Sequence, residues 1–200
     1  MAALSETHGQ TETSDRRTLL ADAALRVLEA DGGRGLTHRA VDREAGLSEG
    51  STSNYYGTRE ALLTGALHRL VELEEPMMQS LEALVPYGPY DARRAAELVA
   101  AQIDDWLQPE RRGREVARYE LSLEARRRPE FRAALNQVRS EFLLRTEQLL
   151  PAAGCRTPRE HAPPLLATLD GLMVNQLFQP ATHLSHEDIV DYLERLFATC

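Results

Sequence analysis

The 200-residue sequence contains no lysine, one tryptophan and only two cysteines, Cys155 and Cys200. Two cysteines so far apart do not make the disulfide framework of a small secreted domain. Long hydrophobic runs are also lacking, because the most apolar later stretch, residues 165–178, is broken by polar residues and is too short to cross a bilayer. Residues 1–14 have neither a basic start nor an apolar segment, so they predict a disordered arm and not a secretory signal. We therefore expect a globular cytoplasmic protein without a membrane partner.

Positive charge is scarce as well, with 23 basic against 31 acidic residues and a formal net charge of −8. The charge is unevenly distributed. Residues 16–70 carry eight arginines and seven acids, about +1 in total, so the remainder carries −9. This distribution excludes a nonspecific coat for nucleic acid and fits a protein that meets an anionic partner at one end.

Residues 36–63 predict two short helices joined by a tight turn, followed by the start of a third helix. Thr37 can cap the first helix. Gly46 lies where that helix must end, because glycine adopts the left-handed conformation of a helix C-terminus without a Cβ clash. Ser48 is then the expected N-cap of the second helix, residues 49–56. This is the layout of a helix-turn-helix, whose second helix enters DNA.

The second helix is too short and too polar to be stable by itself. Its small hydroxyl and amide side chains suit close approach to a sugar-phosphate backbone, and Asn54 can reach a base edge. Thr58 can cap the helix that follows, where Arg59 and exposed amides can hold a phosphate. An amphipathic helix over residues 15–30 supplies the third helix of the module. The alternative is an ordinary helical hairpin with a polar surface helix.

These residues resemble the TetR family of transcriptional regulators over roughly the first third of the chain. The match runs through residues 47–52, Tyr55-Tyr56 and residues 59–62. The resemblance implies the DNA-contacting residues Thr37, Arg39, Ser48, Gly50, Ser51, Thr52, Asn54, Tyr55, Tyr56 and Arg59. Two positions depart from the family pattern, because Glu49 stands where a basic residue is frequent and Ser53 where an aromatic is common. A helical sensor or adaptor that has lost specific DNA binding is therefore the alternative function.

The rest of the chain predicts further helices, so the expected fold class is all-α. We expect helices over residues 91–107, 115–127, 129–150, 164–178 and 186–198, the last opened by a Ser185–Asp188 capping signature. The predicted organisation is a disordered arm (1–14), a three-helix DNA-binding domain (15–60) and a helical effector-binding and dimerisation domain (61–200).

The last two helices carry apolar residues around much of their circumference, which favours burial on two sides. The resemblance implies a homodimer through a four-helix bundle, with the interface residues Leu165, Leu169, Leu172, Leu177, Ile189, Leu193 and Leu196. A monomer core that needs both helices is the alternative. A dimer would place two recognition helices about 34 Å apart on a palindromic operator of double-stranded DNA.

The resemblance also implies a pocket for a small-molecule effector among the middle helices, so that the effector releases a repressor from its operator. Aromatic and thioether side chains suit such a pocket, and we select Met77, Trp106, Tyr119, Leu123, Phe131 and Met173. Plain core packing is the alternative for each. We expect no catalytic site, metal or cofactor, since adjacent acids on a helix diverge and no strand carries a phosphate-binding loop.

Overall fold

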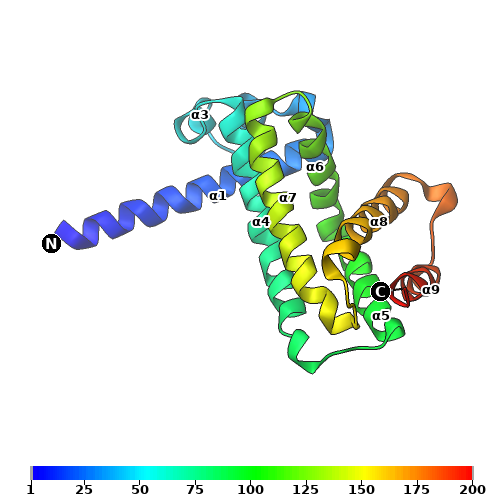
Figure 1. The fold of residues 1–200 in the computed structure, drawn as a ribbon. Helices are drawn as coiled ribbons and strands as arrows, with labels where there is room; N and C mark the ends of the chain where they lie inside the picture. The colour runs from blue at the N-terminus through cyan, green and yellow to red at the C-terminus, as the bar shows by residue number, and fades with distance from the viewer. Residues whose placement is uncertain (1, 200) are drawn as a thin grey trace. The chain divides into compact units, whose positions relative to one another are not determined.

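The computed structural model describes residues 2–199, and side chains from residue 13 onward. Within this range the chain forms nine α-helices, three short 3-10 helices and no strand, which confirms the all-α fold class (Figure 1). The α-helices are α1 (Ala2–Gly35), α2 (His38–Glu44), α3 (Ser51–Tyr55), α4 (Arg59–Glu82), α5 (Ala92–Trp106), α6 (Pro109–Ala125), α7 (Pro129–Leu149), α8 (Pro158–Phe178) and α9 (His186–Phe197). The 3-10 helices are η1 (Val85–Tyr87), η2 (Leu150–Ala153) and η3 (Pro180–Thr182). None of the described helices combines the length and apolar character that crossing a membrane requires.

The chain divides into two compact units, which differ from the domains expected from the sequence. The head unit consists of Met1–Leu73 and Gly113–Asn136, and the body unit of Glu74–Arg112 and Gln137–Cys200. The head unit thus extends beyond residue 60 into α4, and it also takes in parts of α6 and α7. A boundary drawn along the sequence misses this arrangement because two segments far apart in the chain share one unit.

Helix α1 begins at Ala2, so residues 2–14 are helical where the sequence predicted a disordered arm. No proline interrupts this segment, and the amphipathic part that follows nucleates a helix that can extend backward. The predicted apolar stripe of α1 is buried, with Leu20 and Leu28 fully covered. The regular helix ends at Gly32, whose φ of +66° lies in the left-handed region.

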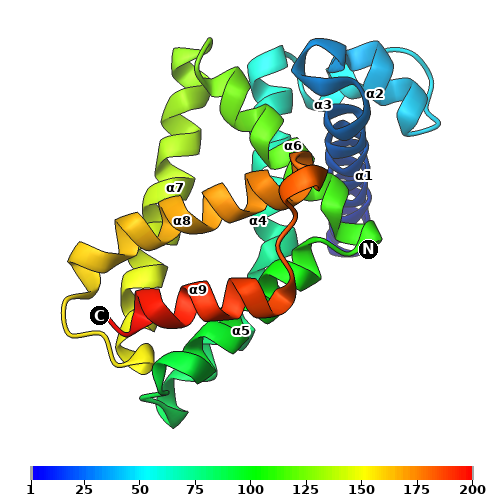
Figure 2. The same cartoon turned by 90° about the vertical axis from the view of Figure 1, so that its right-hand side faces the viewer.

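In the body unit, α5 and α9 lie side by side (Figure 2). Helix α9 buries Ile189, Leu193 and Phe197 on one face, and its N-terminus has the predicted capping box between Ser185 and Asp188. Arg93 of α5 pairs with three acids of α9, which adds a charged edge to this packing.

Two helix starts differ by six residues from the sequence prediction. Helix α6 begins at Pro109, six residues earlier than expected, because Pro109 serves as a first helical residue and not as the end of α5. Helix α8 begins at Pro158, six residues before Pro164, where the sequence analysis placed its start, and it contains both Pro163 and Pro164. Cys155 lies just before α8 and is disulfide-bonded, and Cys200 lies outside the described residues.

Candidate nucleic-acid interface and ligand cavity

The turn between α2 and α3 forms as the sequence predicts, except that the N-cap of α3 is a different residue. Thr37 Oγ1 accepts a hydrogen bond from Ala40 N at 3.1 Å, and Gly46 has a φ of +67°. Helix α3 begins at Ser51 with Gly50 as its N-cap, so Ser48 is not the capping residue. The φ of Gly50 is +92°, a conformation that side-chain-bearing residues rarely adopt.

Asp42 of α2, which the sequence analysis did not select, holds the start of α3. Its carboxylate is buried and accepts hydrogen bonds from Gly50 N (2.8 Å), Thr52 N (2.7 Å) and Thr52 Oγ1 (2.6 Å). Burial by itself raises the pKa of Asp42, but these hydrogen bonds outweigh it and the pKa lies below its usual range. Asp42 therefore caps α3 from the preceding helix.

Two residues expected to contact DNA face the interior of the head unit. Thr52 is fully buried and donates its hydroxyl hydrogen to Asp42. Tyr56 is 7% exposed, and its hydroxyl donates to the carbonyl of Arg17 at 3.1 Å. Burial raises the pKa of Tyr56. Both side chains hold α3 in place and are not available to a phosphate.

Arg59, expected to bind a phosphate, also points inward. Its guanidinium donates to the carbonyls of Gly33 and Leu36 and pairs with Glu124 Oε2 at 3.2 Å. The expected cap of this helix is present, since Thr58 Oγ1 accepts from Ala61 N at 3.0 Å. Arg59 thus ties the start of α4 to the end of α1 and to α6.

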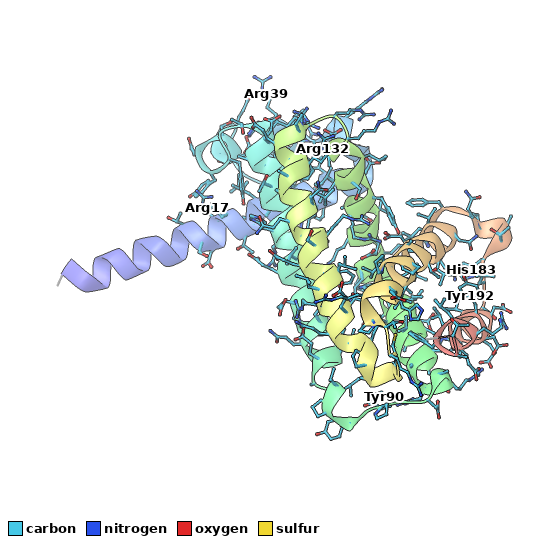
Figure 3. All side chains as sticks on the ribbon, viewed as in Figure 1. Arg17, Arg39, Tyr90, Arg132, His183 and Tyr192 are labelled. Carbon is cyan, nitrogen blue, oxygen red and sulfur yellow. The ribbon has the colours of Figure 1, made fainter. Side chains whose placement is uncertain are left out.

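The other expected DNA-contacting residues are exposed or half-buried. Thr37, Arg39, Ser48 and Asn54 are exposed, and Gly50, Ser51 and Tyr55 are half-buried. Figure 3 shows Arg39 at the edge of the head unit and Arg17 on α1.

Two charged residues, Arg39 and Arg17, affect the charge of this exposed surface in ways that the sequence did not predict. Arg39 forms an exposed ion pair with Glu49, so the acid at the unusual position is neutralised within the chain. Arg17, which the sequence analysis did not select, is exposed and lies over the Tyr55 ring at 5.9 Å from its centroid. Its position at the face formed with α3 is set by tertiary packing, which no local pattern signals.

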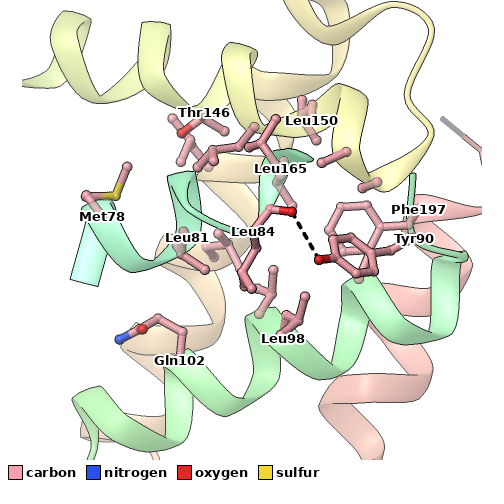
Figure 4. A pocket seen from close by; sticks show the side chains of 18 of the residues that line it. Met78, Leu81, Leu84, Tyr90, Leu98, Gln102, Thr146, Leu150, Leu165 and Phe197 are labelled. Atoms are coloured by element: carbon pink, nitrogen blue, oxygen red, sulfur yellow. Dashed lines mark hydrogen bonds between the residues drawn. The ribbon is translucent and has the colours of Figure 1, made fainter. Parts of the chain in front are cut away.

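The body unit contains a cavity of about 140 Å³ that is partly open to solvent (Figure 4). Its walls come from α4, α5, α7, α8 and the segments that connect them, together with the end of α9. The lining residues are Met77, Met78, Leu81, Leu84, Val85, Tyr90, Ala95, Leu98, Val99, Gln102, Trp106, Phe142, Thr146, Leu149, Leu150, Ala152, Ala153, Leu165, Leu166, Leu169 and Phe197.

Of the six residues expected in the effector pocket, Met77 and Trp106 line this cavity. Phe131 is buried in the head unit, and Met173 is buried in the body unit away from the cavity wall. Tyr119 stacks with Arg118, and Leu123 is 57% exposed. Residue type alone selected these four residues, and residue type does not distinguish a cavity wall from a core or a surface.

Most of the expected dimer residues lie inside the body unit. Leu165, Leu177, Ile189 and Leu193 are buried, Leu169 lines the cavity, and Leu172 and Leu196 are half-buried. The four buried residues are covered within one chain, so they do not form an open surface.

A different row of residues lies exposed on α8. Ala167, Gly171, Val174 and Phe178 recur at steps of four, three and four, and all four are exposed. Val174 and Phe178, the last residue of α8, are 39% and 46% exposed and lie on the same side of the helix. A Cβ added at Gly171 would meet no atom within 4 Å. This row, here called the α8 seam, has the spacing of a helix-packing interface.

A helix-turn-helix with an exposed second helix, followed by a helical unit that contains an apolar cavity, defines a DNA-binding regulator with a ligand-binding unit. The family model for the tetracyclin repressor-like C-terminal domain matches residues 90–199. The chain therefore belongs to the TetR family and is a DNA-binding transcriptional regulator.

Similar proteins cover nearly the whole chain. The helix-turn-helix nicotine-responsive transcriptional repressor HdnoR of Paenarthrobacter nicotinovorans is 28% identical over 92% of this chain and 97% of its own length. The solved structure of a TetR-family member from Streptomyces coelicolor A3 is 31% identical, with a TM-score of 0.72 over 90% of this chain and 97% of that one. The multidrug binding protein EbrR in complex with ethidium is 33% identical, with a TM-score of 0.67 over 90% of this chain and 97% of that one.

Proposed function

We propose that the protein is a homodimeric cytoplasmic repressor that binds a palindromic operator and leaves it when a small molecule occupies the body cavity. The observation that carries the proposal is the outer face of α3, which Asp42, Thr52 and Tyr56 fix from inside. A short helix held in this way presents its exposed side chains in a defined geometry, as a binding surface requires. HdnoR is a nicotine-responsive repressor and EbrR binds ethidium, which supports a ligand-dependent repressor.

The proposed DNA surface comprises the exposed and half-buried residues of this face. We assign Thr37, Arg39, Ser48 and Tyr55 to the sugar-phosphate backbone, Gly50 and Ser51 to close backbone approach, and Asn54 to a base edge. Arg17 joins them, because its guanidinium lies over Tyr55 and is exposed. Thr52, Tyr56 and Arg59 are left out because they face the interior of the head unit, where their polar groups are hydrogen-bonded, whereas the Arg39–Glu49 ion pair is exposed.

Helix α4 is the element through which a ligand can act on the head unit. It contributes Arg59–Leu73 to the head unit, whereas Met77, Met78 and Leu81 line the cavity of the body unit. A ligand shifts the population of DNA-binding molecules only if it binds one conformation of the protein better than the other. Contacts with the cavity residues of α4 supply that difference in binding energy.

Fluorescence anisotropy with duplexes from the DNA flanking the gene tests this function. We expect Arg39→Ala to weaken binding to all duplexes by about tenfold and to reduce the slope of log K against log salt by about 1 per subunit. Arg156→Ala, which removes an exposed arginine of the body unit, is the matched control and should leave both quantities unchanged. Asn54→Ala should instead reduce the preference for the operator over a scrambled duplex. Absence of any complex at low salt with duplex in excess would contradict the proposal.

A further inference from the structure

The cavity of the body unit is lined almost entirely by hydrocarbon and thioether side chains. Met78, Leu81 and Leu98 are examples, and no charged side chain occurs among the described residues that line it. A charged group that entered such a space would lose its hydration without gaining a counter-ion. The walls therefore favour an uncharged ligand.

The polar groups of the wall already donate hydrogen bonds within the protein. Tyr90 Oη donates to the Leu84 carbonyl at 3.1 Å, and Thr146 Oγ1 to the Phe142 carbonyl at 2.9 Å. Gln102 Nε2 donates to an Asp105 carboxylate oxygen at 3.3 Å. Of these groups only the Gln102 amide keeps a second N–H, so an anionic ligand would find few donors, whereas a ligand hydroxyl can donate to the oxygen lone pairs that remain.

The acids of α4 do not supply a counter-ion for a cation. Glu75 and Glu82 both hold the guanidinium of Arg145 at 2.7 Å, and Glu74 accepts from the indole nitrogen of Trp106 at 2.9 Å. These acids are not part of the cavity wall. A cationic ligand is therefore disfavoured as well.

The residues that line the cavity are spread along much of α5. The wall residues of α5 run from Ala95 to Trp106, which corresponds to about 16 Å along a helix. Figure 4 shows Gln102 toward one end and Tyr90 with Phe197 at the other. The volume of about 140 Å³ is close to that of an engineered cavity that binds a single benzene. A small volume whose wall extends this far along one helix accommodates an extended chain better than a fused ring system.

We infer that the effector is an elongated, uncharged and mainly hydrocarbon molecule, of the class of a medium-chain alcohol or ester. The inference rests on the proposed function, since it names the ligand class of the same cavity. Trp106 is the only tryptophan of the sequence and lies in the wall, so its fluorescence reports occupancy directly.

The test uses the full-length protein without DNA and follows Trp106 emission during titration with 1-butanol, 1-hexanol, 1-octanol, octanoate and octylammonium. We expect affinity to rise about fourfold per methylene along the alcohols. Octanoate and octylammonium should bind at least about 100-fold more weakly than 1-octanol, because neither charge finds a partner in the wall. Charged compounds that bind as tightly as the alcohol, or a series in which no alcohol saturates, would overturn the inference.

Two variants test whether 1-octanol binds in the cavity of the body unit. Val99→Phe fills the wall of α5 and should weaken 1-octanol binding at least tenfold, whereas Ala101→Phe adds the same ring at an exposed position of α5 and should not. Equal binding by the two variants would overturn the assignment to this cavity. If Val99→Phe fails to fold, the comparison of charged and uncharged ligands on the unmodified protein still decides the ligand class. Binding of 1-octanol without release of the operator would leave the ligand class standing and contradict the proposed repressor mechanism.

Discussion

At the scale of single residues, Asp42 is the side chain on which the presentation of α3 depends most directly. We expect Asp42→Asn to lower the free energy of unfolding by about 1–3 kcal/mol at pH 7, because one amide oxygen cannot replace two carboxylate oxygens that accept three hydrogen bonds. Affinity for the operator should fall as well, since α3 loses its fixed start. Urea unfolding and anisotropy measure the two effects.

The pH dependence of the same variant gives an independent check. The pKa of Asp42 is lower in the folded protein than in the unfolded chain, so its stabilising contribution is present above about pH 4 and is lost as the pH falls through the folded value. The difference in unfolding free energy between wild type and Asp42→Asn should therefore shrink in acid. Asp15→Asn, at an exposed position of α1, serves as the control and should show neither effect. A difference that stays constant with pH would rule out the capping role of the ionised carboxylate.

The sequence predicted the local features of this site better than its long-range contacts. Thr37, Gly46 and Thr58 act within a few residues of their own positions, and their roles follow from capping and backbone rules. Thr52 and Tyr56 were misassigned because a five-residue helix is too short for a hydrophobic period to tell its inner from its outer face.

At the scale of elements, the corner between α6 and α7 supports the helix-turn-helix within the head unit. Glu124 of α6 is buried and binds Arg59 of α4 at 3.2 Å and Arg128 at 3.1 Å. Burial by itself raises the pKa of Glu124, but the hydrogen bonds from the two arginines outweigh it and lower that pKa. Glu120 adds a contact to the end of α1, where its carboxylate accepts from Gly33 N at 2.8 Å.

The variant Glu124→Gln tests how much the contacts of Glu124 with Arg59 and Arg128 stabilise the head unit. We expect a loss of about 2 kcal/mol in the free energy of unfolding, because the neutral amide leaves partly buried guanidinium groups without their carboxylate partner. Glu130→Gln, which changes an exposed acid of α7 in the same way, is the matched control. Equal stability of the two variants would show that the cluster is only a surface ion-pair network.

Helix bounds were predictable where one strong signal marks an end. Helix α9 begins after Ser185, whose side chain caps it as expected, and α7 begins at Pro129. Helix α5 begins one residue later than expected, because Asp91 is its N-cap and not its first helical residue. The starts of α6 and α8 were misplaced because a proline can end one helix or begin the next, and the local sequence does not decide between them. Most of the residues that line the cavity could not be predicted from the sequence, because its walls come from segments as distant as Met77 and Phe197.

At the scale of the whole molecule, the α8 seam is the surface on which we expect two chains to meet. Phe178→Arg should convert the dimer to a monomer in sedimentation velocity, because it places an unpaired charge in an apolar contact at the largest side chain of the seam. Leu144→Arg, at an apolar position of α7 that is 56% exposed, is the matched control and should remain dimeric. A dimer that survives Phe178→Arg would place the interface elsewhere.

Dimerisation and DNA binding should fail together in the seam variant. A single head unit makes half of the phosphate and base contacts of a pair. A monomer nevertheless loses the full translational and rotational entropy of association when it binds. We expect Phe178→Arg to bind the palindromic operator at least about 100-fold more weakly than the dimer and with half the salt slope. A single half-site duplex should be bound with nearly the same affinity by wild type and variant, because α3 and its supports are unchanged. If the variant lost half-site binding as well, the defect would lie in the head unit and not in the pairing of chains.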